Sequence, residues 1–163
     1  MKYVFFYDFP VGSLGIAEDD GAICRVFFAA ENAPDGFEVA ETPLIRSAAA
    51  QLAEYFDGKR RVFDLPLRPQ GTQFQQSVWR ALQAIPAGET RSYQEIAAAV
   101  GNPKASRAVG MANNRNPIVI IVPCHRVIGK NGALVGYGGG LRVKEHLLEM
   151  EKSPATAAAT GLV

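Results

Sequence analysis

The sequence Pro123-Cys124-His125-Arg126 contains the residues whose types and spacing are best suited to chemistry. It follows an aliphatic run at 118–122, so Cys124 is expected to be buried. A cysteine reacts as its thiolate, and with a pKa of about 8.5 only a few per cent of it is ionised at neutral pH. A nucleophilic Cys124 therefore needs a base or a positive charge nearby, and His125 is the first candidate for the base.

The adjacency of Cys124 and His125 raises a geometric difficulty. In an extended chain, successive side chains point to opposite faces, so the thiol and the imidazole cannot simply touch. Two arrangements overcome this: a sharp backbone turn, helped by the fixed φ of Pro123, or a water molecule that relays the proton. A lone buried cysteine would ordinarily be an inert small hydrophobe, but the neighbouring His125 and Arg126 favour a reactive one.

A histidine that acts as a base usually needs a carboxylate on its other ring nitrogen. The helix expected at 141–152 offers Glu145, Glu149 and Glu151. Its apolar stripe has i, i+4, i+7 spacing and consists of Val143, Leu147 and Met150. Glu151 is the preferred partner because it flanks this stripe, whereas the other two lie further from it.

The elements that would position these residues begin at Gly71. Thr72 with Gln75, and Ser92 with Glu95, have capping-box spacing, and they predict helices at 73–84 and 93–100. A third helix is expected at 104–112. Two short helices joined by a glycine-containing turn are typical of a helix-turn-helix, although such hairpins are also common in enzymes. Residues 118–122 are expected to form a short buried strand or extended segment.

The first part of the chain has a different pattern. Aromatic and β-branched runs predict strands at 2–9, 13–18, 22–30 and 61–67, with a hairpin turn at 19–21 and a helix from Pro43 that stops at Asp57-Gly58. We therefore expect an α+β fold: an N-terminal β-sheet lobe with a helix (1–69), packed on a mostly helical domain with a helix-turn-helix (70–152). Residues 153–163 are expected to be a disordered tail.

Composition narrows the class of protein. Residues 1–69 hold 7 Lys/Arg against 11 Asp/Glu, and residues 70–163 hold 10 against 5, so a polyanion would meet the second half. No apolar run is long enough to cross a bilayer, and no signal peptide is recognisable. Two cysteines and two histidines without CxxC or HxxxH spacing argue against a disulfide framework and against zinc. A cytoplasmic protein is expected.

Two stretches, "FQQSVWRALQAIPAGETRSYQEIAAAVGNPKASRAVGMANNRNPIVIIV" and "IVPCHRVIGKNGALVGYGGGLRVKEHLLEME", closely resemble the O6-alkylguanine-DNA alkyltransferases, or methylated-DNA–protein-cysteine methyltransferases. The resemblance covers about residues 70–152, and the first lobe is compatible but less diagnostic. It implies a monomeric, single-turnover DNA repair protein without a cofactor. Such a protein binds double-stranded DNA through the minor groove, flips the damaged nucleotide and transfers the alkyl group of O6-alkylguanine irreversibly to Cys124. O4-alkylthymine is a second candidate substrate.

The resemblance also implies roles for individual residues. Cys124 is the acceptor, His125 with Glu151 activates it through water, and Asn116 braces the turn. Tyr93 presses on the phosphate backbone, and Arg107 is the finger that enters the base stack. Further DNA-binding positions are Ser92, Ala105, Ser106, Gly110 and Arg115. The guanine pocket is formed by Val127, Tyr137, Gly138 and Gly139. Many relatives carry serine at the position of Gly138, so one hydroxyl donor is missing here.

Two alternatives stay open. A Cys-His hydrolase would attack an acyl carbon, but no hydrolase motif fits. A lesion-binding helix-turn-helix protein without transfer would leave Cys124 without a purpose, and in the non-enzymatic branch of the family tryptophan replaces that cysteine. Some relatives bind a metal in the first lobe, but Cys24 is the only cysteine there and no histidine precedes His125. No metal site is therefore expected.

Overall fold

A computed structural model describes residues 1–29, 34–133, 137 and 139–152. The chain forms two compact units, residues 1–69 and residues 70–152, which are described here one at a time. The expected disordered tail, 153–163, lies outside the described residues. Within the described residues, no helix is both long enough and apolar enough to cross a membrane.

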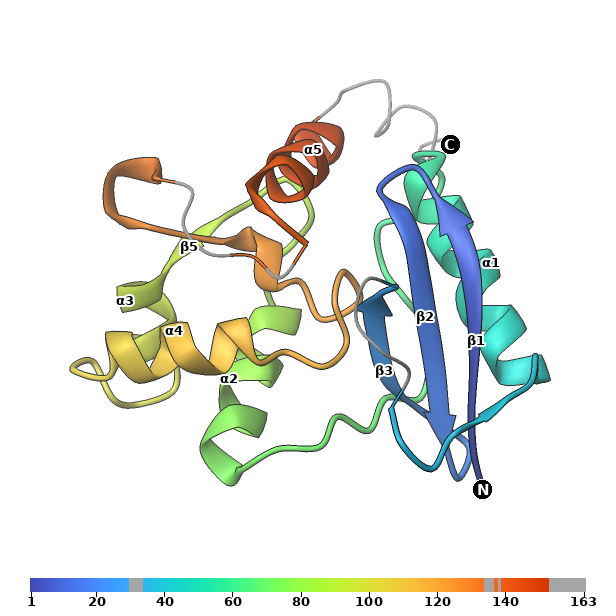
Figure 1. The fold of residues 1–163 in the computed structure, drawn as a ribbon. Helices are drawn as coiled ribbons and strands as arrows, with labels where there is room; N and C mark the ends of the chain where they lie inside the picture. The colour runs from blue at the N-terminus through green and yellow to red at the C-terminus, as the bar shows by residue number, and fades with distance from the viewer. Residues whose placement is uncertain (30–33, 134–136, 138, 153–163) are drawn as a thin grey trace. The chain divides into compact units, whose positions relative to one another are not determined.

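The first unit is built on a four-stranded sheet with the order β3-β2-β1-β4 (Figure 1). β1 (Lys2–Phe9), β2 (Gly12–Asp19) and β3 (Ala22–Phe28) form an antiparallel meander, and β4 (Glu38–Val39) pairs in parallel with β1. The turn between β2 and β3 places Asp20 and Gly21 at φ 54° and 83°. Two successive positive φ values are what a tight two-residue hairpin requires, so the predicted turn is confirmed.

One helix, α1 (Pro43–Phe56), packs on β1, β2 and β3 of this sheet. The Thr42 hydroxyl accepts a hydrogen bond from the Ile45 amide, and Pro43 occupies the first turn, as the sequence predicted. The buried face consists of Ile45, Ala48, Ala49, Leu52 and Tyr55. A second apolar cluster of Val4, Ala17, Cys24 and Phe27 buries Cys24.

The strand predicted at 61–67 is wrong. This segment makes one isolated parallel bridge, between Ile23 and Leu67, with the Ile23 amide donating to the Pro66 carbonyl at 2.8 Å. Pro66 has no amide hydrogen, so it cannot donate to a regular ladder. The strand that the sequence did not predict, β4, is only two residues long and both are exposed. It therefore carries no alternating pattern.

The second unit contains four α-helices in its described residues: α2 (Gln73–Gln83), α3 (Tyr93–Ala99), α4 (Ser106–Asn114) and α5 (Leu141–Lys152). Both predicted capping boxes are present, at Thr72 and at Ser92. α3 and α4 pack on each other and on α2, and the buried Trp79 indole donates to the Ala112 carbonyl at 2.9 Å. A short parallel ladder joins β5 (Arg91–Ser92) to β6 (Val127–Ile128).

The segment predicted as a buried strand or extended segment, 118–122, is buried, but its central residues, 119–121, form a turn. The Val122 amide donates to the Ile118 carbonyl at 3.0 Å, and Ile120 adopts φ 72°. A β-branched residue rarely adopts a positive φ, so the fold holds this loop in a costly conformation. A short apolar run has no periodicity that separates a strand from a buried turn, and the prediction failed for this reason.

Candidate active site

Cys124 begins a 3₁₀ turn, Cys124–Arg126, that closes with a hydrogen bond from the Arg126 amide to the Pro123 carbonyl at 3.0 Å. Of the two arrangements considered from the sequence, the backbone turn is thus present. The turn is deeply buried: Cys124 is 4% exposed and His125 is 0% exposed. Three residues per turn separate successive side chains by about 120°, so the thiol and the imidazole still point in different directions.

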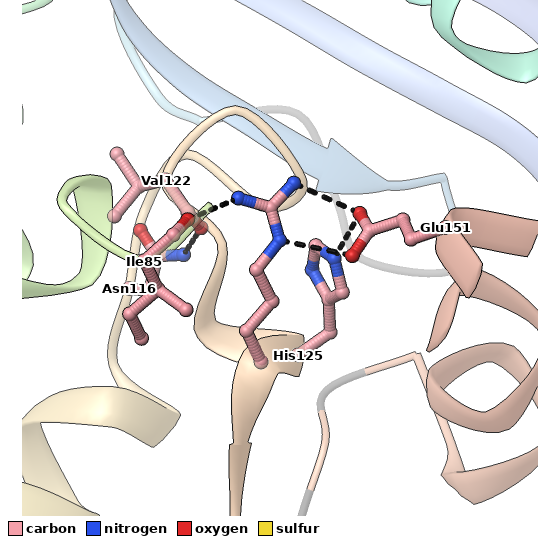
Figure 2. A network of polar contacts seen from close by, with 6 residues as sticks. Ile85, Asn116, Val122, His125 and Glu151 are labelled. Carbon is pink, nitrogen blue, oxygen red and sulfur yellow. Dashed lines mark hydrogen bonds and ion pairs between the residues drawn. The ribbon is translucent and has the colours of Figure 1, made fainter. Parts of the chain in front are cut away.

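Asn116 holds the loop that leads to Cys124. Its Nδ2 donates to the carbonyls of Val122 at 2.7 Å and Ile118 at 3.3 Å, and its Oδ1 accepts from the Ile118 amide at 3.0 Å. Figure 2 shows this amide beside Val122. Since these backbone groups are buried and would otherwise cost free energy, Asn116 stabilises the unusual loop. This bracing agrees with the role that the resemblance implies.

A network of polar contacts joins His125 and Arg126 of the turn to Glu151 (Figure 2). His125 Nε2 lies 2.8 Å from Glu151 Oε2. Arg126 binds the same carboxylate with two donors, Nε to Oε1 and Nη2 to Oε2, both at 2.9 Å. Its Nη1 also donates to the Ile85 carbonyl at 2.6 Å. Both Glu151 oxygens are thereby hydrogen-bonded in a buried place.

The network fixes the protonation states of its members. Burial favours the neutral form of Glu151, but the hydrogen bonds and charges of His125 and Arg126 outweigh it and hold the pKa at about 2. Burial also lowers the pKa of His125, more than Glu151 raises it. A neutral imidazole facing a carboxylate must carry its hydrogen on Nε2, so its Nδ1 offers a lone pair.

The thiol of Cys124 is not ionised by its surroundings. Burial raises its pKa to about 11, and the Asn116 amide and the charge of Lys144 only partly oppose this. At neutral pH the sulfur therefore carries its proton in this state and depends on a base.

Two tyrosines also lie near the thiol. The pKa values of Tyr93 and Tyr137 are raised, first by burial and then by the proximity of Cys124. Tyr93 starts α3 and also lies beside Gly110 of α4, where an added Cβ would meet its ring at 3.8 Å. Val127 is buried directly after the turn. Tyr137 and Gly139 are half-buried, and Gly138 lies outside the described residues.

The residues expected to bind DNA lie on α3, α4 and their flanks. Arg107 and Arg115 are exposed, whereas Ser92, Ala105, Ser106 and Gly110 are half-buried. Ser92 caps α3 with its side chain, so its hydroxyl already has a structural role. Arg107 lies near the start of α4, on the surface and away from the buried face formed by Val109, Ala112 and Asn113.

The buried face of α5 differs from the predicted stripe. It consists of Lys144, Leu147, Leu148 and Glu151, while Val143 and Met150 are only half-buried. Glu151 therefore lies within the buried face and not on its flank. The prediction failed because an apolar pattern contains no information about buried charged residues. Lys144 and Glu151 of this helix are buried.

Sequence reasoning missed three functional candidates. Arg126 was noted only as a neighbouring charge, yet it makes the bidentate pair with Glu151. Lys144 is fully buried, and its Nζ donates to the Val127 carbonyl at 2.7 Å. Asn113 is buried and donates to the Cys124 carbonyl at 3.3 Å. The one usable signal was the seven-residue spacing of Lys144 and Glu151, which places both on one helix face. Within the described residues, no three His, Cys, Asp or Glu side chains form a metal site.

Comparison with known proteins identifies the family of the chain. Residues 73–153 match the family described as "6-O-methylguanine DNA methyltransferase, DNA binding domain", and residues 2–69 match its "ribonuclease-like domain". The chain is 52% identical to the methylated-DNA–protein-cysteine methyltransferase of Methanosarcina acetivorans, over 93% of this chain and 99% of that one. It is also 52% identical to the constitutive enzyme of Bacillus subtilis, over 93% and 96%.

The structural comparisons extend over both units. The Mycobacterium tuberculosis O6-methylguanine methyltransferase matches with a TM-score of 0.89 and 44% identity, over the whole of both chains. The same organism's OGT in complex with DNA matches with a TM-score of 0.87 and 45% identity, over 95% of this chain and 97% of that one. The two units and the buried cysteine site thus define a two-part DNA alkyltransferase. The chain belongs to the 6-O-methylguanine DNA methyltransferase family.

Proposed function

We propose that this chain is a DNA repair protein that transfers the alkyl group of O6-alkylguanine in DNA to its own Cys124. The single observation that carries the assignment is the buried Cys124 turn, placed beside the His125–Glu151–Arg126 network in a chain of this family. The product is a thioether, which no group in the site can cleave. Each molecule therefore acts once, and no cofactor enters the reaction.

The protonation states support a proton route from the sulfur to His125. The Cys124 thiol has a pKa of about 11 and needs a base, and the neutral imidazole has an available lone pair on Nδ1. Successive side chains of a 3₁₀ turn diverge by about 120°, so in this proposal a water molecule passes the proton from the sulfur to Nδ1. The resulting imidazolium is stabilised by the Glu151 carboxylate, which the Arg126 pair keeps ionised.

Bond formation then follows. The thiolate attacks the alkyl carbon, an S–C bond forms as the C–O6 bond breaks, and the guanine leaves with the electron pair. The imidazolium returns its proton to the base, so the products are neutral guanine and S-alkylcysteine. Val127, Tyr137, Gly138 and Gly139 form the guanine pocket in this proposal.

DNA binding places the damaged base in this pocket. The alkylated oxygen is hidden in a duplex, so the nucleotide must be flipped out at a cost of a few kcal/mol. The helix pair α3–α4 lies in the minor groove, Arg107 fills the vacated space, and Tyr93 presses on the backbone beside the flipped nucleotide. Ser92, Ala105, Ser106, Gly110 and Arg115 lie along the same contact. A minor groove carries little sequence information, which suits a search for lesions in any context.

The decisive experiment incubates the protein with a duplex containing O6-methylguanine and measures peptide masses. We expect one added methyl group on the Cys124 peptide and no more than one equivalent of repaired base. Cys124→Ser should abolish transfer and retain lesion binding, because serine removes the nucleophile with little change in shape. An unmodified Cys124 in wild-type protein that binds the lesion would instead support a lesion-binding helix-turn-helix protein.

Transfer to a cysteine sulfur requires a compartment in which thiols stay reduced. Both cysteines are free and buried, and Cys124 must remain a thiol until it meets DNA. We propose that the protein works as a monomer in the cytoplasm, where thiols are kept reduced.

A further inference from the structure

Asn113 lies beside the Cys124 turn but has no role in the reaction proposed above. It lies in the last turn of α4 and is 2% exposed. Its Nδ2 donates to the carbonyl of Cys124 at 3.3 Å, so its side chain lies against the reactive turn. Its Oδ1 is buried and has no hydrogen-bond partner among the described residues.

A second buried acceptor without a partner flanks the same cysteine. His125 Nε2 donates to Glu151, so Nδ1 carries a lone pair, and that atom is also buried without a partner among the described residues. A buried polar atom left unsatisfied costs about 1–3 kcal/mol. In proteins, such atoms are commonly satisfied by buried water that makes about three hydrogen bonds.

We propose that Asn113 is a positioning residue for proton transfer: its Nδ2 holds the Cys124 carbonyl, and its Oδ1 binds the water that links the Cys124 thiol to His125. The proposal rests on the function proposed above. A water molecule has two hydrogens and two lone pairs. With one hydrogen on Asn113 Oδ1 and the other on His125 Nδ1, a lone pair is left to accept the thiol proton.

In this arrangement the proton moves from Cys124 through the water to His125. The water accepts the proton of Cys124 as it gives its own proton to His125 Nδ1, so it remains a neutral water throughout. The hydrogen on Asn113 Oδ1 stays in place, because an amide oxygen is a very weak base. The thiolate then takes the alkyl carbon as described above, and the imidazolium later protonates the departing guanine.

Asn116, the other buried asparagine near the turn, is not suited to this role. Its two Nδ2 hydrogens are used by the carbonyls of Ile118 and Val122, and its Oδ1 accepts from the Ile118 amide. The Asn116 acceptor is therefore already used by the backbone of the loop, whereas the Asn113 acceptor is not.

The test compares methyl-transfer rates of wild type, Asn113→Leu and Asn114→Leu on the same O6-methylguanine duplex, from about pH 7 to about pH 10. Leucine is similar in size to asparagine but cannot accept a hydrogen bond. Asn114 is the exposed neighbour on α4 and serves as the matched control. We expect Asn113→Leu to be slower by about tenfold or more at neutral pH, since a positioned proton acceptor contributes roughly 10²–10⁴-fold.

The pH dependence separates this role from a merely structural one. As the pH approaches the thiol pKa of about 11, hydroxide forms the thiolate directly and the deficit should shrink to about twofold. The other charged or titratable groups around Cys124 are common to all variants: Lys144 and Glu151 of α5, Tyr93 of α3, Tyr137, and His125 with Arg126. Because these groups are the same in every variant, their titration does not change the ratio of the Asn113→Leu rate to the wild-type rate at a given pH.

Thermal unfolding and lesion binding establish that each variant is folded. If Asn113→Leu does not fold, Asn113→Ser provides the comparison, because its hydroxyl oxygen still accepts a hydrogen bond. That variant should keep a rate within about threefold of wild type at neutral pH, because the acceptor is retained. A deficit of equal size at every pH, or no deficit, would overturn the role of Asn113. Failure of the wild type to methylate Cys124 would instead refute the proposed function.

Discussion

The two units of the chain bury different kinds of side chain. In the first unit, the described core is apolar on both faces of the sheet, and Glu18 is its one buried charged residue. The second unit buries Asn113, Asn116, His125, Arg126, Lys144 and Glu151. Burying charges costs free energy that their mutual attraction only partly returns. The difference indicates that the first unit is arranged for stability, whereas the second gives up stability to bury polar and charged side chains around Cys124.

The largest expected effect on stability comes from removing Arg126 from the buried ion pair with Glu151. Arg126→Met should lower the free energy of unfolding by about 3–5 kcal/mol, because it leaves the Glu151 carboxylate buried without its ion-pair partner. The matched control is Arg60→Met in the first unit. It removes a partly exposed pair with Glu54 at 2.8 Å, and such pairs contribute about 0–1 kcal/mol. Urea titration of both variants gives the two values, and equal losses would contradict the contrast between the units.

A smaller effect is expected in acid. The pKa of Glu151 is about 2 in the folded chain against 4.5 for the free side chain, so the unfolded state binds its proton first. Its contribution to stability is complete above about pH 4.5 and is lost as the pH falls towards 2. The lowered pKa of His125 acts in the same direction, since the unfolded histidine charges at about pH 6.5.

The single tryptophan gives a direct readout of this acid effect. Trp79 is buried in the second unit, so its fluorescence should change at a higher pH than the circular dichroism of the strands, all but four residues of which lie in the first unit. Coincident transitions at one pH would mean that the buried charges do not set the acid stability of their own unit.

The smallest effect on stability is expected at the surface that is proposed to face DNA. Arg107→Ala should change the free energy of unfolding by less than about 0.5 kcal/mol, because the side chain is exposed. It should nevertheless slow methyl transfer from duplex DNA by about tenfold, because Arg107 no longer stabilises the flipped state. A tenfold change corresponds to about 1.4 kcal/mol. Transfer from the free base should hardly change. Arg80→Ala, another exposed arginine of the second unit, is the control, and equal slowing on both substrates would exclude the finger role.

Features set by neighbours in sequence were predictable. Thr42, Thr72 and Ser92 each precede a helix and cap it as their spacing indicated, because a cap depends on atoms within four residues. The hairpin at Asp20-Gly21 followed for the same reason. The adjacency of Cys124 and His125 and the spacing of the last helix already indicated Glu151 as a partner, and the family resemblance implied the same group.

Features set by distant parts of the chain were not predictable. The path of 118–122 depends on Asn116, whose amide replaces the hydrogen bonds of a strand. The buried face of α5 depends on Arg126 and Val127, which receive Glu151 and Lys144. In both cases polar groups are buried because another part of the chain forms hydrogen bonds with them. Hydrophobic periodicity contains no information about such hydrogen-bond partners.

The separation of Cys124 from Glu151 along the chain also bears on how the protein is made. Cys124 is synthesised 27 residues before Glu151, the carboxylate that orients His125 in the proposed reaction. Until α5 folds onto the Cys124 turn, His125 lacks its contact with Glu151. The arrangement that the proposed reaction needs around His125 is therefore completed only after α5 has been synthesised and has folded.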